Sequence, residues 1–218
     1  MTSVNTNVGA MIALQNLNAT NAQLEVTQSR INTGKQVSSA KDNGAIWAIA
    51  QGQRADIGAL GAVKQSLDRG VAAVDVALAA GETVSDLLLQ MKEKALAATD
   101  LSLTTSARSA LNEDFISLRD QIASVTTNAE FNGVNLLETG ASGFGALANV
   151  SGTSTLSVAA EVMALGSTNV SVSTTQAIDT LSAATASLTA VNDSIDAVSG
   201  ALARLGTSSK ALTTHNTF

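Results

Sequence analysis

The chain has 218 residues, of which 45% are hydrophobic, enough for one or two domains with a sizeable core. It contains no cysteine, which excludes both a disulfide framework and a thiolate metal site. The formal net charge is −6, and the twelve lysines and arginines are scattered without interleaved aromatic residues, so we expect no nucleic-acid partner.

The first predicted element is a helix over residues 4–33. Leu17, Leu24 and Ile31 recur at heptad spacing, and Met11 and Leu14 extend the same apolar seam toward the start. The other faces are rich in Asn, Thr, Gln and Ser. Because isolated helices are marginal in water, a seam this narrow needs a partner helix.

Residues 36–43 form a polar connector, and a long helical pattern follows over about 44–99. Two heptad seams run along it, one of Ile46, Gln53, Leu60, Leu67, Val74, Gly81 and Leu88, and one of Ile57, Val71 and Leu78. The complete absence of proline favours such an uninterrupted helix. Glycine weakens a helix interior, so a break near Gly81 stays open.

Two further helices and a strand region complete the pattern. Apolar residues alternate at spacings of four and three over about 106–128, and a fourth helix over about 174–213 begins at a capping box, Ser173 to Gln176. Between them, short alternating pieces such as residues 154–158 and 170–172 predict a few strands within about 134–172. The fold class is mainly α, a long antiparallel coiled-coil helical bundle with a small β-hairpin region.

We expect two domains: residues 1–43, a helix and its connector, and residues 44–218, a helical domain. No stretch approaches the roughly 20 apolar residues of a membrane span, so we expect no membrane partner. The first residues lack a cationic region followed by an apolar run, so we also expect no cleavable export signal.

Candidate chemical groups are few. The single histidine, His215, lies in a polar tail and is interpreted as frayed and exposed rather than catalytic. The carboxylate pairs Glu113–Asp114 and Asp193–Asp196 are interpreted as solvated charged faces. We therefore predict no catalytic residue, no cofactor, no metal site and no enzymatic activity.

A family resemblance rests on the residues around the connector. Residues 31–35 read Ile-Asn-Thr-Gly-Lys, residues 39–42 read Ser-Ala-Lys-Asp, and residues 48–50 read Ala-Ile-Ala. Residues 131–137, Phe-Asn-Gly-Val-Asn-Leu-Leu, follow at the end of the third predicted helix. Together these pieces closely resemble the N-terminal signature of bacterial flagellins, with Ser39, Ala40, Lys41 and Asp42 as the signature connector. The short interval between residues 137 and 173 resembles compact alphaproteobacterial flagellins.

This resemblance implies a structural subunit of the bacterial flagellar filament that self-assembles by coiled-coil packing of terminal and core helices for swimming motility. It implies a homo-oligomer of protofilaments, located outside the cell in the flagellum. The expected further partners are an export chaperone, the type III export apparatus, and the filament cap and hook-junction proteins. Flagellins continue into another amphipathic helix that pairs with the first, and the resemblance implies that this C-terminal helix is missing here.

The first helix is the candidate assembly interface. We hypothesise that its apolar residues are unburied in the free monomer, are buried on assembly, and leave the segment disordered until then. The interface residues are Val8, Met11, Leu14, Leu17, Leu24 and Ile31. The alternative for this stripe is an ordinary intramolecular core helix.

Two other functions remain open from the residues. One is a coiled-coil adaptor that binds partner helices in a finite complex. The other is a hook–filament junction protein, which shares the terminal helices. Concentration-dependent filaments would separate the filament subunit from a complex of fixed stoichiometry.

Overall fold

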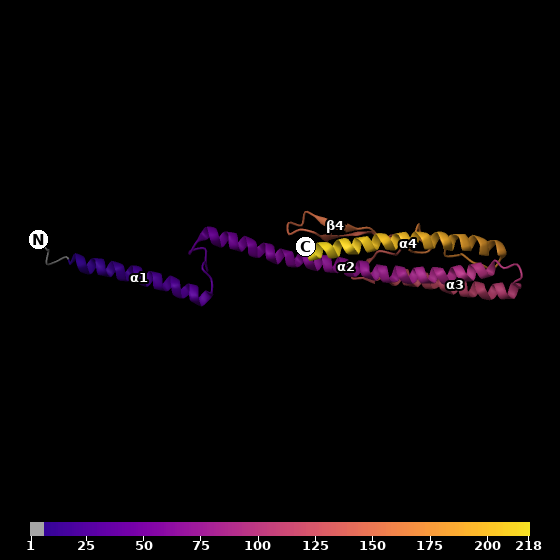
Figure 1. Cartoon of the computed structure of the whole chain (residues 1–218), viewed down its shortest axis with the longest axis horizontal. Coiled ribbons are helices and arrows are strands. Elements are labelled where there is room, and N and C mark those ends of the chain that lie inside the picture. Colours follow the sequence, from indigo (N-terminus) through magenta and orange to yellow (C-terminus); the bar gives the residue numbers. More distant parts are fainter. Residues whose placement is uncertain (1–6) are drawn as a thin grey trace. The chain divides into compact units, whose positions relative to one another are not determined.

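The computed structural model describes residues 7–218, which divide into two compact units (Figure 1). The first unit ends at Ala59 and the second runs from Leu60 to Phe218. Helix α2, Gly44–Ala98, contributes residues to both. The expected division at residue 43 stays a prediction.

The first unit contains α1, Val8–Thr33, and the beginning of α2. The Asn7 side chain caps α1 by accepting a hydrogen bond from the Ala10 amide at 3.1 Å. Gly34, with φ 65°, ends the helix in the left-handed conformation that glycine adopts at low cost. Asn43 caps α2 through a 3.1 Å bond from the Ile46 amide. The sequence correctly predicted the separate helices on either side of the connector.

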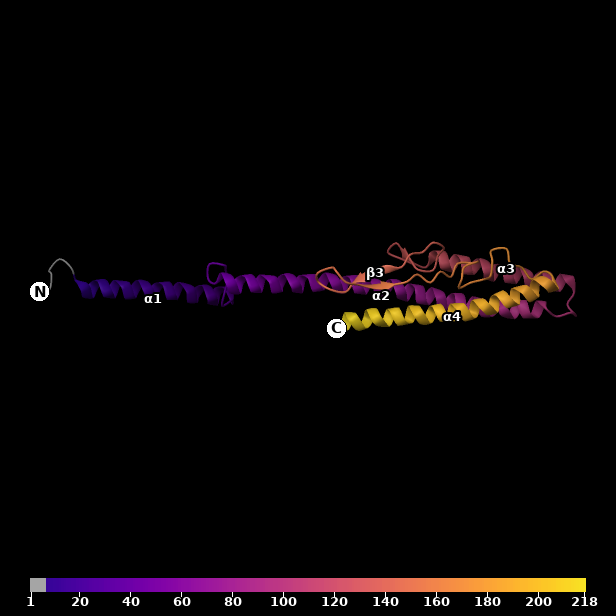
Figure 2. The same ribbon diagram turned by 90° about the horizontal axis from the view of Figure 1, so that it is seen from above.

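The second unit is a bundle in which the rest of α2 packs with α3, Thr105–Asn128, and α4, Leu181–Thr217. Figures 1 and 2 both show these three helices side by side. Helices α2 and α4 are antiparallel, since Asp75 bonds Ser209 at 3.2 Å while Asp68 bonds Asn216 at 2.7 Å. The core includes Leu67, Val74, Leu88, Met91, Phe115, Ile122, Val191, Val198, Leu205 and Leu212.

Helix α2 continues without a break through Gly81. This glycine is buried where α2 meets α4, and a Cβ there would lie 2.7 Å from Leu202 Cδ2. The missing side chain therefore permits close helix packing rather than ending the helix.

In the described part of the chain, four short strands form two antiparallel hairpins. Strands β1, Glu130–Phe131, and β2, Val134–Asn135, are joined by Asn132 and Gly133, both at positive φ, which suits a tight hairpin turn. Strands β3, Phe144–Leu147, and β4, Thr155–Val158, pair with Phe144 opposite Val158. The mainly α fold class with a small β-hairpin region is confirmed.

Two expectations about the segment before α4 were wrong. Ser173 to Gln176 forms an isolated turn, with the Gln176 amide donating to the Ser173 carbonyl at 3.1 Å, and α4 begins at Leu181 with Thr180 as its cap. Residues 170–172 are not a strand, because this segment bonds to α4 instead: the Ser171 amide donates to Ser194 Oγ at 2.9 Å. Side chains of the bundle thus replace the local hydrogen bonds that the sequence pattern favoured.

None of the helices in the described part of the chain is long and apolar enough to cross a membrane.

Candidate functional site

The most distinctive surface of the first unit is the apolar face of α1. Its six predicted interface residues are all exposed, by 55% to 75%, and no residue of α1 is buried. They are Val8, Met11, Leu14, Leu17, Leu24 and Ile31, here called the α1 stripe. A helix that buries none of its apolar face lacks the tertiary packing that normally stabilises helices. The surface is therefore a candidate for contact with another helix.

The beginning of α2 carries a second exposed stripe. Ile46, Ile49 and Ile57, here called the α2 stripe, are 52% to 68% exposed, and the first buried residue of α2 is Val63. Ile46 and Ile57 continue the heptad seams that bury Leu67 and later residues of α2. In the structure they are exposed, unlike Leu67. The heptad seams of α2 include Ile46 and Ile57 of the α2 stripe, but periodicity does not say which chain supplies the helix that packs against them.

The signature connector is held by the carboxylate of Asp42. Its Oδ2 accepts hydrogen bonds from the Ser38 amide at 3.1 Å, the Ser38 hydroxyl at 2.8 Å and the Ser39 amide at 3.1 Å. The Ser38 hydroxyl bond, followed by the two amide bonds, lowers the pKa of Asp42 below its ordinary value. Ala40 and Lys41 are exposed. The signature thus includes a polar clip that fixes the chain between α1 and α2.

The histidine and the carboxylate pairs named as candidate chemical groups all lie in the second unit. His215 lies within α4 and is half-buried, with Nε2 2.7 Å from the Ala148 carbonyl oxygen, so the frayed-tail interpretation was wrong. Asp114 pairs with Lys94 at 2.8 Å, and Asp193 and Asp196 are exposed. Within residues 7–218 no cluster of three or more metal-ligating side chains occurs.

The sequence is similar to one family along most of its length. Residues 4–141 match the family described as the bacterial flagellin N-terminal helical region. Flagellin FljM of Caulobacter vibrioides is 50% identical over 218 residues, which cover 100% of this chain and 79% of the relative. Flagellin C of Rhizobium meliloti is 41% identical over 142 residues, which cover 65% of this chain and 43% of the relative.

The fold also resembles a solved structure. The crystal structure of Bacillus cereus flagellin matches with a TM-score of 0.62 at 19% sequence identity, covering 71% of this chain and 88% of that chain. At this identity the likeness supports the helical bundle fold alone.

Proposed function

This chain belongs to the flagellin family and is a structural subunit of the bacterial flagellar filament, and from this premise we propose that the α1 and α2 stripes are the surfaces through which copies of the chain join. The observation that carries the proposal is that α1 contains no buried residue, whereas the second unit has a well-packed core. Contacts that join different patches of identical subunits generate an open helical assembly.

The size of the exposed surface supports an assembly role. The α1 stripe alone includes six large aliphatic side chains, and contiguous apolar patches on soluble proteins commonly mark interaction sites. Burying one such side chain contributes roughly 1.5–3 kcal/mol, so a few contacts per subunit are enough to favour assembly. The finite-complex alternatives, a coiled-coil adaptor or a hook–filament junction protein, are not favoured by the family match.

The finer partners follow from the same exposed surfaces. An apolar stripe that is uncovered before assembly needs protection, so we propose that an export chaperone covers it and that the type III export apparatus carries the chain outside the cell. At its two ends a filament must meet other proteins, which we propose to be the cap and the hook-junction proteins. The role is structural, and we propose no enzymatic activity. Surface labelling of the filament on intact cells tests the extracellular location.

The assembly test uses the only tryptophan, Trp47, which is half-buried in the first turn of α2. The purified chain is raised in concentration with short filament seeds, while Trp47 emission and sedimentation are followed. We expect filaments above a critical concentration and a blue shift of the emission as the α2 stripe becomes covered.

Substitutions in the α1 stripe test whether it is the assembly interface. Leu17→Asn with Leu24→Asn should raise the critical concentration roughly tenfold or more, because polar groups would enter an apolar contact. The matched control Asn21→Ser changes an exposed polar position of α1. Thermal unfolding of the bundle should be the same in all three chains. Unchanged assembly of the double variant would contradict the assigned interface, and the absence of wild-type filaments would contradict autonomous assembly.

Whether α1 is ordered before assembly is a separate question. We propose that α1 is protected from hydrogen exchange only in the filament, because its helix buries no residue in the free chain. Protection of residues 8–33 in the monomer equal to that of α3 would overturn this prediction.

A further inference from the structure

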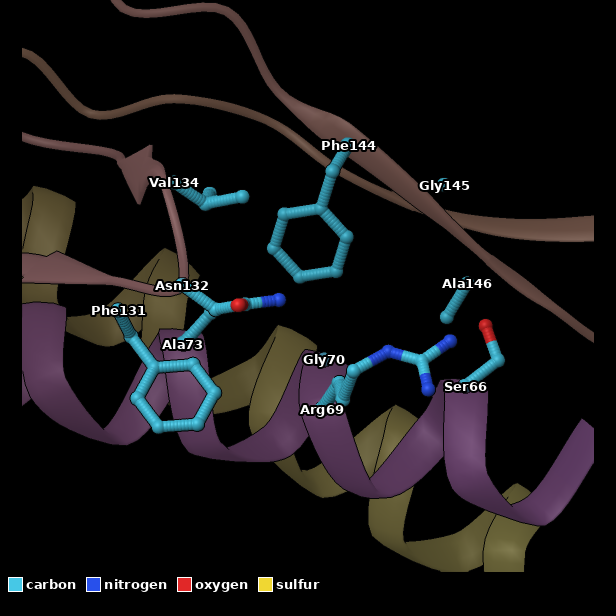
Figure 3. A pocket seen from close by; sticks show the side chains of 10 residues that line it. All are labelled: Ser66, Arg69, Gly70, Ala73, Phe131, Asn132, Val134, Phe144, Gly145 and Ala146. Atoms are coloured by element: carbon cyan, nitrogen blue, oxygen red, sulfur yellow. The ribbon is translucent and has the colours of Figure 1, made fainter.

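The second unit contains a small hollow between α2 and its two hairpins, with a volume of about 180 Å³ (Figure 3). Pockets for small molecules and cofactors usually measure ~300–1,000 Å³, so this one suits a single side chain. It is lined by Ser66, Arg69, Gly70 and Ala73 of α2, Phe131, Asn132 and Val134 of the first hairpin, and Phe144, Gly145 and Ala146 of β3.

The shape of the hollow depends on Gly70 and Asn132, where the close packing and the backbone conformation restrict which residue can stand. A Cβ on Gly70 would lie 3.0 Å from Phe144 Cε2, so the glycine leaves the Phe144 ring room beside the helix. Asn132 sits in the hairpin turn at φ 52°, and its side chain points into the hollow (Figure 3). The two phenylalanine rings form apolar walls on either side of Asn132.

The polar groups that line the hollow can all donate hydrogen bonds. Arg69 supplies a guanidinium, Asn132 a primary amide and Ser66 a hydroxyl. The Ser66 oxygen accepts a bond from the Leu147 amide at 3.1 Å, which leaves its proton available for another acceptor. None of the ten lining residues is acidic. A site with one cation, two further donors and apolar walls matches a carboxylate on a short aliphatic stem.

Within residues 7–218, no carboxylate forms an ion pair with Arg69. The helical neighbours at positions 65, 66, 72 and 73 are Gln, Ser, Ala and Ala, so no i±3 or i±4 ion pair exists along α2. Among residues 7–218 the ion pairs involve Lys94, Arg119 and Arg204 instead. The Arg69 charge is therefore exposed and available to another molecule.

We propose that this hollow, the Arg69 socket, receives an aspartate or glutamate side chain of a second copy of the chain in the filament. The inference rests on the assembly role proposed above and adds a second contact in the other unit. With 18 acidic and 12 basic side chains, identical copies repel one another on average. A cationic socket that accepts an acidic side chain would offset this repulsion locally and fix the register of neighbouring subunits.

The first test compares seeded assembly of wild type, Arg69→Gln and Arg69→Glu. We expect the critical concentration to rise roughly tenfold for Arg69→Gln and further for Arg69→Glu, which places two negative charges together. The matched control is Lys64→Gln, which removes an exposed charge from the same helix outside the hollow. Assembly should depend less on salt in Arg69→Gln than in the wild type. Equal effects of the Arg69 and Lys64 variants would overturn the socket, because net charge alone would explain them.

The second test identifies the acidic side chain. Filaments of Arg69→Lys, assembled from a mixture of ¹⁵N-labelled and unlabelled chains, are treated with a carbodiimide, which joins an amine to a contacting carboxylate with loss of water. We expect a cross-linked peptide that combines labelled and unlabelled halves and contains position 69. Filaments without any such mixed cross-link would overturn the socket while leaving the assembly role intact. Failure of the wild type to assemble would overturn both.

Discussion

Gly143 lies against Val158 at the start of the β3–β4 hairpin, so closely that a Cβ on Gly143 would overlap the Val158 carbonyl oxygen. The neighbouring backbone, including the Ala159 Cα at 3.0 Å, closes the same space. A backbone oxygen cannot move aside as the end of a long side chain can. The hairpin that forms one wall of the Arg69 socket therefore depends on a residue without a side chain.

We accordingly predict that Gly143→Ala destabilises the second unit by about 1–3 kcal/mol, the usual cost of forcing an extra methyl group into a packed site. Urea unfolding followed by circular dichroism measures the change. Gly206→Ala in α4 is the control, because a Cβ at that position would have no neighbouring heavy atom within 4 Å. That control should be neutral or stabilising by up to about 1 kcal/mol. Equal stability of both variants would contradict the predicted overlap.

A buried hydrogen bond holds the segment before α4 to α3. Asn112 Oδ1 accepts a 2.7 Å bond from the Ile178 amide, and both residues are buried. Asn112→Ala would leave that amide without a partner, so we predict a loss of about 1–3 kcal/mol in the free energy of unfolding. Urea unfolding gives the magnitude, and hydrogen exchange should show faster exchange at Ile178 in particular. Gln121→Ala, at an exposed position of the same helix, should change neither quantity.

The ion pair between Arg204 and Glu161 is asymmetric in burial. Two bonds of 2.7 Å join the groups, but the Arg204 side chain is 57% exposed and that of Glu161 only 11%. Removing the arginine leaves a buried carboxylate without its cation, whereas removing the carboxylate leaves an exposed cation that water can solvate. We predict that Arg204→Gln destabilises the second unit more than Glu161→Gln does.

Thermal unfolding of the two variants and the wild type at neutral pH checks this order. A larger loss in Glu161→Gln than in Arg204→Gln would contradict the assignment of Glu161 as the buried partner.

The sequence predicted the helices well because their signals are local and long. Heptad seams located the buried residues Leu67, Val74 and Leu88 of α2, and the N-terminal half of the same seam predicted a helix that the structure also contains. The error at the start of α4 has a tertiary cause. The Ile178 amide donates a hydrogen bond to Asn112 Oδ1, and Arg119 donates one to the Gln176 carbonyl oxygen. These bonds to α3 hold residues 176–178 outside the helix, so Ser173 and Gln176 form a turn instead of a capping box.

The candidate site was less predictable than the fold. Periodicity marked the α1 stripe, and the heptad seams of α2 run from Ile46 and Ile57 into the core. The pattern did not show where burial begins, because an apolar seam looks the same whether its partner lies in the same chain or in another one. The Arg69 socket left no linear motif. It is assembled from α2 and two hairpins, and only the fold places Arg69 and Phe144 around the same hollow.

Acid should release the connector clip at Asp42. The hydrogen bonds from Ser38 and Ser39 stabilise the ionised carboxylate and lower its pKa below the ordinary value of 3.8. A group whose pKa is lowered by folding contributes stability that is complete above its ordinary pKa and is lost as the pH falls through the lowered pKa. The clip should therefore stay closed at about pH 5 and open only below about pH 4.

The measurement is an NMR titration of the Asp42 carboxyl carbon, together with the amide shifts of Ser38 and Ser39. We expect all three signals to titrate together with a midpoint below 3.8. In Asp42→Asn the amide shifts should be independent of pH over the same range, because no carboxylate is left to titrate. A midpoint at or above the ordinary value would mean that the bonds do not favour the ionised form. Amides that shift identically in the variant would show that another group opens the connector.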